Sequence, residues 1–203
     1  LNETKSRFKR FSQTVLYAPH FISMVVMVGM LNTLFSPSMG VINTLREALG
    51  MERYYYMAQP SAFRHLYVWS GVWQNIGWDA VIYLAALSAV DPSLHEAAMI
   101  DGASRIQRIT HINLPTILPT IVILFIMAVG RVASVGYEKV YLLQNDLNVD
   151  VSEVISTYVY KRGVLNSNYS FSTAVGLFNN VVNIALLLMA NFISRRLGET
   201  SLF

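Results

Sequence analysis

The sequence predicts an all-α membrane protein that crosses the lipid bilayer several times. Hydrophobic residues make up 54% of the 203-residue chain and charged residues only 13%, whereas a soluble domain usually carries about 25% charged residues. The mean hydropathy is +0.42. Four apolar segments are each long enough to cross a bilayer, which takes about 20 helical residues. Soluble core helices are rarely this long and this apolar, so the pattern favours a polytopic helical membrane protein.

The predicted membrane spans differ in how uniform their composition is. The four spans are residues 13–35, 66–87, 114–133 and 171–193. Pro19 lies inside the first span. The third span is the most uniformly apolar, and its only charged residue is Arg131, near its end. We therefore expect four transmembrane helices in this chain.

Two connections, between the first and second spans and between the third and fourth, are predicted to contain further short helices. Residues 39–51 have the spacing of an amphipathic helix. Asp150 and Glu153 have the spacing of a capping box, which predicts a helix through about residue 161 that ends at Gly163. No internal repeat or low-complexity linker is visible, so we predict a single domain over residues 1–203.

Basic residues beside the spans predict the orientation, because cytoplasmic connections carry an excess of lysine and arginine. Eight such residues lie in three short segments on one side: Lys5, Arg7, Lys9, Arg10, Arg105, Arg108, Arg195 and Arg196. Seven lie on the other side, in longer connections. The density of positive charge favours cytoplasmic N-terminal and C-terminal ends, with the connection between the second and third spans on the same side.

That connection contains the most specific spacing in the chain. It carries Glu96, Ala97, Ala98, Gly102, Ile112, Leu114 and Pro115. With a frequency of about 8% per residue type, this spacing would arise by chance at roughly 1 in 10⁸ per starting position. Asp91 can cap a helix that begins at Pro92, and Gly102 can end it in the left-handed conformation. Ser104 can cap a second helix toward the third span, so the stretch predicts a short helix-turn-helix.

One face of the first predicted helix suits a close contact with another protein. Leu94, Ala97, Ala98 and Asp101 share this face by helical spacing. The small side chains of the two alanines protrude little, so a partner surface can approach this low face closely. The alternative is an ordinary helical hairpin at the membrane interface.

The same pattern resembles the EAA loop of binding-protein-dependent ABC importer permeases, and all seven positions match. The resemblance implies the type I ABC importer permease fold, and a loop at about residues 91–113 that carries a coupling helix for a cytoplasmic ATPase. The residues implied in ATPase coupling are Glu96, Ala97, Ala98, Asp101, Gly102, Ile112, Leu114 and Pro115. Family members commonly have six spans, so the four predicted here correspond to the last four of six.

The chain carries no pattern typical of an enzyme. It has no phosphate-binding G-x-x-x-x-G-K-[ST] loop, no nucleophile set and no cysteine, and its four histidines are scattered. We expect no cofactor on this chain, and the resemblance implies that a separate ATPase subunit binds ATP and magnesium. The net charge of +3 is small and dispersed, so nucleic acid is not an expected partner.

Polar and aromatic residues in the second and fourth predicted spans are candidates for a solute pathway, because polar groups inside spans are costly. They are Trp69, Trp73, Asn75, Trp78, Asp79, Asn179, Asn180 and Asn183. Amides and carboxylates suit the hydroxyl groups of sugars, and aromatic rings suit their apolar faces. The alternative is that the asparagines hold helices together and the tryptophans lie at the membrane interface.

A second, less specific resemblance narrows the solute. Motifs at residues 67–73, 83–86, 135–141, 172–179 and 194–203 are similar to the carbohydrate-uptake branch of the family, which is related to maltose permeases. The resemblance implies an oligosaccharide or sugar importer in the bacterial cell membrane, with ABC ATPase subunits, a second, different permease subunit and an extracellular solute-binding lipoprotein as partners. The alternatives are a permease for another solute, such as glycerol phosphate, and a non-transporting membrane scaffold subunit.

Overall fold

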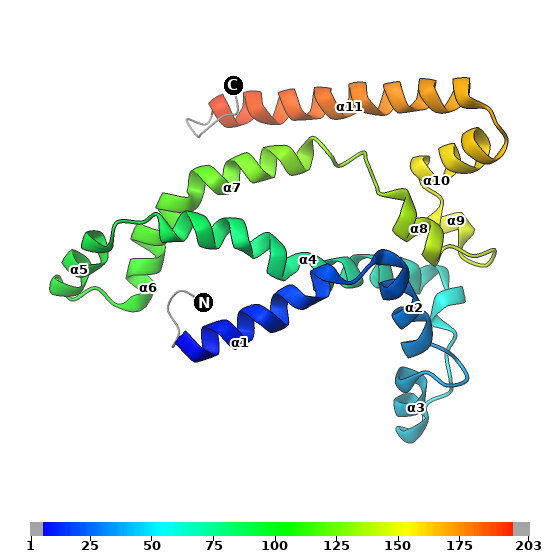
Figure 1. The fold of residues 1–203 in the computed structure, drawn as a ribbon, viewed down its shortest axis with the longest axis horizontal. Helices are drawn as coiled ribbons and strands as arrows, with labels where there is room; N and C mark the ends of the chain where they lie inside the picture. The colour runs from blue at the N-terminus through cyan, green and yellow to red at the C-terminus, as the bar shows by residue number, and fades with distance from the viewer. Residues whose placement is uncertain (1–5, 197–203) are drawn as a thin grey trace. The chain divides into compact units, whose positions relative to one another are not determined.

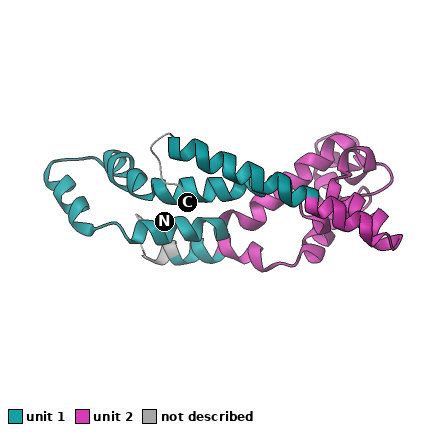
Figure 2. Ribbon diagram, turned by 90° about the horizontal axis from the view of Figure 1, so that it is seen from above, with its two compact units in different colours: residues 1–14, 77–134, 178–203 teal, residues 15–76, 135–177 magenta. Residues whose placement is uncertain are grey.

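The computed structural model describes residues 6–196, and every regular element in this part of the chain is helical. The helices form two compact units (Figure 2). Of the described residues, unit 1 holds 6–14, 77–134 and 178–196, and unit 2 holds 15–76 and 135–177. Lys5 and most of the motif at residues 194–203 lie outside the described residues.

The first predicted span is sharply bent. It consists of α1 (Ser6–Tyr17), η1 (Ala18–Phe21) and α2 (Met24–Leu34), and the axis turns by 99° between Phe21 and Met24 (Figure 1). Pro19 lies in the first turn of η1, and the side chain of Ser23 caps α2 by accepting a hydrogen bond from the backbone N–H of Val26. The segment predicted as the first span, residues 13–35, is therefore interrupted, because a new helix is capped after the proline, and the bent pair counts as one candidate span.

Two of the remaining helices are long and apolar enough to cross a membrane. They are Arg105–Val129, which ends with α7 (Leu114–Val129), and α11 (Tyr169–Arg196). With the bent pair counted as one span, the described residues offer up to three candidates, fewer than the four predicted. The second predicted span forms α4 (Pro60–Ser88), which has 29 residues but is not apolar enough to be counted. Its polar residues, including Gln74, Asn75 and Asp79, explain the lower hydropathy.

Unit 2 has a hydrophobic core built from segments far apart in the sequence. Its buried members are Val28, Met57, Phe63, Leu66, Val140 and Leu143. They come from α2, η2 (Tyr56–Ala58), α4 and α8 (Tyr137–Leu143). The predicted amphipathic helix also lies in this unit, as α3 (Val41–Ala48).

Two buried asparagines organise the connections around this core. The Asn43 amide donates to the carbonyls of Ser36 and Tyr54, both at 3.0 Å, and its Oδ1 accepts from the Tyr54 N–H at 2.8 Å. The Asn148 amide donates to the carbonyls of Met57 and Leu143 at 3.0 and 3.1 Å. Each asparagine thus satisfies backbone groups that no helix ladder serves.

The capping box predicted at Asp150 and Glu153 is wrong. Asp150 lies inside the short helix α9 (Val149–Ser152), and the next helices are α10 (Ile155–Val159) and the π-helical η4 (Tyr160–Leu165). Gly163 does not end this segment. A Cβ on Gly163 would lie 1.5 Å from Ser172 Oγ, so this glycine allows a close approach between η4 and α11.

Unit 1 also contains a close helix contact. A Cβ on Gly130, directly after α7, would lie 2.8 to 2.9 Å from side-chain atoms of Leu187 in α11. One helical turn away, Asn183 Nδ2 donates to Ser134 Oγ at 2.6 Å. Small residues that let helices approach, joined by a side-chain hydrogen bond, are typical of membrane helix packing.

Candidate functional site

The predicted helix-turn-helix is present and begins as expected. The first helix, α5 (Pro92–Ile100), is capped by Asp91, whose Oδ1 accepts a hydrogen bond from the Ser93 N–H at 2.9 Å. Hydrogen bonds from the backbone N–H and from the side chain of Ser93 hold the pKa of the Asp91 carboxyl below its usual value. Pro92 occupies the first turn, where the absence of an N–H costs nothing.

The turn after α5 requires its glycine. Gly102 has a φ of +76°, a conformation that residues with a Cβ rarely adopt. The Gly102 N–H donates to the Met99 carbonyl at 3.1 Å, and the Ala103 N–H donates to the Ala98 carbonyl at 2.8 Å. A Cβ at position 102 would meet nothing within 4 Å, so only the backbone conformation restricts the residue type.

The second helix is α6 (Arg105–Arg108), and Ser104 caps it as predicted. The Ser104 N–H donates to Gln107 Oε1 at 2.8 Å, and the Gln107 N–H donates to Ser104 Oγ at 3.3 Å. The helix continues through the π-helical η3 (Ile109–Asn113) into α7 without a break (Figure 1). Ile112 therefore lies in η3, and Leu114 and Pro115 form the first turn of α7.

The hairpin is exposed along its length. No residue of α5 or α6 is buried, and Ile100 and Ile106 are 85% and 74% exposed. Glu96, Ala97 and Asp101 are exposed and Ala98 is half-buried. The low face predicted at the two alanines is thus available to a partner.

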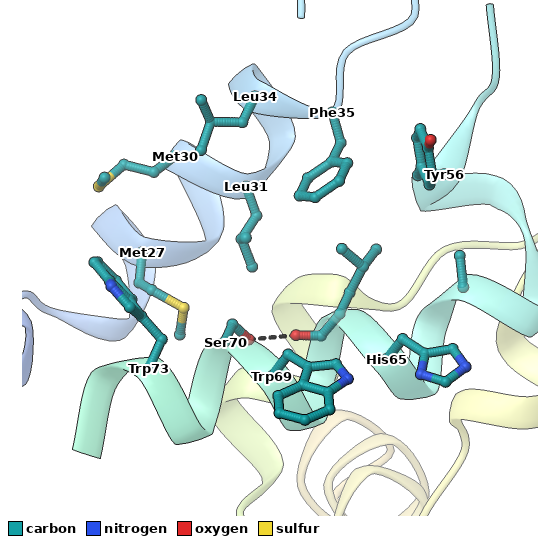
Figure 3. A pocket seen from close by; sticks show the side chains of 12 residues that line it. Met27, Met30, Leu31, Leu34, Phe35, Tyr56, His65, Trp69, Ser70 and Trp73 are labelled. Carbon is teal, nitrogen blue, oxygen red and sulfur yellow. Dashed lines mark hydrogen bonds between the residues drawn. The ribbon is translucent and has the colours of Figure 1, made fainter. Parts of the chain in front are cut away.

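Of the candidate pathway residues, Trp69 and Trp73 line an apolar cavity of 480 Å³ in unit 2. Figure 3 shows Met27 and Leu31 of α2 on one side of this cavity and the two tryptophans of α4 on the other. Ser70 does not offer the cavity a free hydroxyl, since its Oγ donates to the Leu66 carbonyl. The cavity suits apolar groups rather than the hydroxyl groups of a sugar.

Asn75 lines a second, polar cavity of 470 Å³ in the same unit. Its walls are Met24, Tyr67, Val68, Gly71, Gln74, Asn75, Gly136, Glu138 and Lys139. The Asn75 amide donates to the Gly71 carbonyl at 3.0 Å, and its Oδ1 lies 3.1 Å from His20 Nδ1. Gln74 donates to the Ile22 carbonyl at 2.8 Å, and its buried Oε1 has no hydrogen-bond partner among the described residues.

Lys139 is a functional candidate that the sequence did not single out. It is buried in α8, and its Nζ donates to the Tyr67 carbonyl at 2.6 Å. The available signal was a single lysine followed directly by the apolar residues of a short helix, a weak pattern. Burial lowers the pKa of Lys139 to about 8.

The other candidate pathway residues lie in unit 1. Asn183 has its amide bonded to Ser134, while its buried Oδ1 has no partner in the described part of the chain. Asn179 and Asn183 share one face of α11, whereas Asn180 points to another by helical geometry. Trp78 and Asp79 are exposed on α4. The candidate pathway residues are therefore divided between the two units.

Long apolar helices, a bent helix pair and an exposed, capped hairpin between two long helices are the features of a polytopic helical membrane protein. The chain belongs to the family of binding-protein-dependent transport system inner membrane components, whose model matches residues 3–199. This family and the EAA spacing agree, and they give the type I ABC importer permease fold.

Two curated relatives from Bacillus subtilis (strain 168) are each 41% identical over 204 aligned residues. They are the polygalacturonan/rhamnogalacturonan transport system permease protein YteP and protein LplB. The match covers 100% of this chain and 64% of each relative, so the chain spans somewhat less than two thirds of their length.

A solved structure shares the fold over nearly the whole chain. It is a bacterial alginate ABC transporter in complex with an alginate pentasaccharide-bound periplasmic protein. The TM-score is 0.92 at 41% sequence identity, over 99% of this chain and 70% of the other.

Proposed function

We propose that this chain is the permease part of an ATP-driven importer that moves an oligosaccharide or sugar across the bacterial inner membrane. The observation that carries the proposal is the hairpin of α5 and α6, capped at Asp91 and Ser104 and turned at Gly102. On its low face, Ala97 is exposed and Ala98 is half-buried. A rigid exposed element between two long helices suits the transmission of motion from a partner. The chain acts as a transport subunit and not as an enzyme.

The proposed partners follow from this role. ABC ATPase subunits bind ATP and magnesium and dock on the hairpin, so no cofactor binds this chain. A second permease subunit completes the pathway, and an extracellular binding lipoprotein delivers the solute. The names of the relatives and the solved transporter, which concern polygalacturonan and alginate, support an oligosaccharide as the solute.

The proposed pathway uses the polar side of α4. At about 1.5 Å per residue, the 29 residues of this helix are long enough to cross a bilayer, although its polar residues lower its hydropathy. Asn75 and Asp79 are separated by four residues and share a face of α4. Polar groups on a spanning helix are favoured only where they meet water, solute or a partner. We propose that Asn179 and Asn183 on α11 contribute in the same way.

The experiment that tests the proposal uses Ala98→Trp in the complex reconstituted with its ATPase and binding protein. The large ring overfills the docking face, and overpacking typically costs about 1–3 kcal/mol. We expect loss of ATPase co-purification and of solute-stimulated ATP hydrolysis. Val181→Trp is the control, because it places the same ring on α11, outside the hairpin, at a position that is already apolar and exposed.

The outcomes separate the main alternatives. Normal co-purification and stimulation in Ala98→Trp would reject the docking role of α5. A complex that binds the ATPase but never responds to solute would instead favour a scaffold subunit. Stimulation by glycerol phosphate and not by oligosaccharides would favour a permease for that solute.

A further inference from the structure

We propose that Lys139 recognises a carboxylate of the solute, so that the polar cavity of unit 2 selects oligosaccharides with acidic sugar units. This inference rests on the proposed function, because it gives a solute class to a cavity on the proposed pathway. Three features carry it: the burial of the ammonium group, its missing counter-charge and the chemistry of the cavity wall.

The ammonium group of Lys139 is held in a defined place. Lys139 is 7% exposed, and its Nζ lies 4.7 Å from the centre of the Tyr67 ring and 2.6 Å from the Tyr67 carbonyl oxygen. A Cβ on Gly71 would lie 3.0 Å from Nζ, so the absence of a side chain at residue 71 leaves room for the group. A lysine fixed in this way by α4 is a positioned charge and not a mobile surface group.

This charge has no counter-ion in the described part of the chain. Among residues 6–196, Lys139 forms no ion pair with a carboxylate. An ammonium has three N–H donors, and the Tyr67 carbonyl accepts from one of them. Burying a charge without a partner is costly. A ligand carboxylate in the cavity lined by Lys139 would supply both the missing charge and the missing acceptors.

The rest of the wall favours a carboxylate on a hydroxylated molecule over a phosphate. Glu138 lines the same cavity without forming an ion pair with Lys139, and it would repel a doubly charged phosphate more strongly than a singly charged carboxylate. The amides of Gln74 and Asn75 and the Tyr67 side chain are suitable neighbours for hydroxyl groups. The volume of 470 Å³ lies within the range of small-molecule sites, roughly 300–1,000 Å³.

The test measures initial uptake into proteoliposomes that contain the assembled importer with its ATPase and binding protein. The two solutes are an oligogalacturonide and the same oligosaccharide with its carboxyl groups reduced to alcohols. Lys139→Met removes the charge and keeps the length of the side chain. We expect uptake of the acidic solute to fall by about tenfold or more, since a buried charge loses its partner, while uptake of the neutral solute is unchanged. Lys139→Arg should keep most of the acidic uptake.

Controls separate recognition from assembly. Arg64→Met removes an exposed cation from α4 outside the cavity and should alter neither uptake. Rates are normalised to the amount of assembled complex. An equal fall for both solutes in Lys139→Met would show a structural role and overturn the inference. Equal uptake in Lys139→Met and the unmodified protein would overturn it too.

Two further outcomes decide the ligand and the underlying function. Stronger inhibition of uptake by glycerol phosphate than by galacturonate would overturn the carboxylate assignment. Uptake of neither oligosaccharide by the unmodified importer would overturn this inference, and uptake of no other sugar either would overturn the proposed function with it. The outcomes that concern Lys139→Met overturn the inference alone.

Discussion

Gly50 and Gly102 have the same backbone conformation in two different places. Both have a φ of +76°, and a Cβ on either would meet nothing within 4 Å. Gly102 ends α5 in unit 1, whereas Gly50 follows α3 in unit 2. Any substitution therefore causes a similar backbone strain at both positions, and a difference in function must come from the location.

We predict that Gly102→Val abolishes coupling to the ATPase, while Gly102→Asn retains most of it. The left-handed conformation costs about 1–2 kcal/mol for a residue with a Cβ, and asparagine tolerates it best. Solute-stimulated ATP hydrolysis in the reconstituted complex is the measurement. Gly50→Val is the matched control and should keep normal stimulation. Equal loss in both valine variants would indicate general instability in place of a role for the hairpin turn.

The pH dependence of uptake provides a second prediction at the residue scale. Burial lowers the pKa of Lys139 to about 8, so the group is charged at neutral pH and loses its proton as the pH rises through about 8. The groups that face it are Tyr67, Gln74 and Asn75 of α4, with Glu138 on its own helix. A uronate carboxyl stays ionised over this range, so uptake of the acidic solute should fall there.

The measurement compares uptake of the acidic and the carboxyl-reduced oligosaccharide between pH 6.5 and 9.5. Lys139→Arg should lose the pH dependence, because a guanidinium group stays protonated over this whole pH range. A pH profile shared by both solutes would contradict the prediction, since it would report the titration of another component.

At the element scale, two residues of α4 hold the bend of the first helix pair. Gln74 donates to the Ile22 carbonyl, directly between η1 and α2, and Asn75 pairs with His20 on η1. The Ile22 carbonyl needs this partner because the helix is interrupted there. A change at Asn75 therefore alters the bend and the polar cavity together. Within residues 6–196, Lys139 bonds to the Tyr67 carbonyl and not to the bend, so it gives a cleaner test of the cavity.

The contact between α7 and α11 gives a prediction for helix packing. Gly130→Ala should destabilise the protein by about 1–3 kcal/mol, because its Cβ would overlap the Leu187 side chain. Adding Leu187→Ala should remove the overlap and restore part of the stability, with a coupling energy of about 0.5–3 kcal/mol. Thermal unfolding in detergent measures all three variants. Gly176→Ala is the control, because a Cβ there meets nothing within 4 Å. Additive effects of the two changes would show that Gly130 and Leu187 are not in contact.

At the scale of the whole molecule, the proposal to be tested is the orientation of the chain in the membrane. The chain has no cysteine, so single cysteines can be introduced without removing any. Ser93 is exposed at the start of α5, and Leu147 is 66% exposed in the connection between α8 and α9. Asn148 would be a poor reporter, since it is 2% exposed and bonded to the Met57 and Leu143 carbonyls.

We predict that an impermeant thiol reagent labels Leu147→Cys in intact cells but leaves Ser93→Cys unlabelled. The hairpin then lies in the cytoplasm, as ATPase docking and the distribution of basic residues require. Labelling of both positions after permeabilisation is the control for accessibility. Reaction of Ser93→Cys in intact cells would reject the orientation and the cytoplasmic placement of the coupling hairpin.

Features that depend on neighbouring residues could be predicted from the sequence alone. The helical class followed from composition and from the length of the apolar segments. Both caps and the turn of the hairpin could be predicted, because the hydrogen bonds around Asp91, Gly102 and Ser104 join groups only two to five residues apart. Such local interactions leave a spacing that can be recognised without knowledge of the fold.

Features that depend on contacts between distant segments could be seen only in the folded chain. Lys139 became a candidate only when its ammonium was found against the carbonyl of Tyr67, 72 residues earlier in the chain. The bend after Pro19, the role of Gly163 as a close contact and the burial of Asn148 against Met57 also depend on packing. A lone lysine, glycine or asparagine has several structural uses, and the partner brought to it by the fold selects one of them.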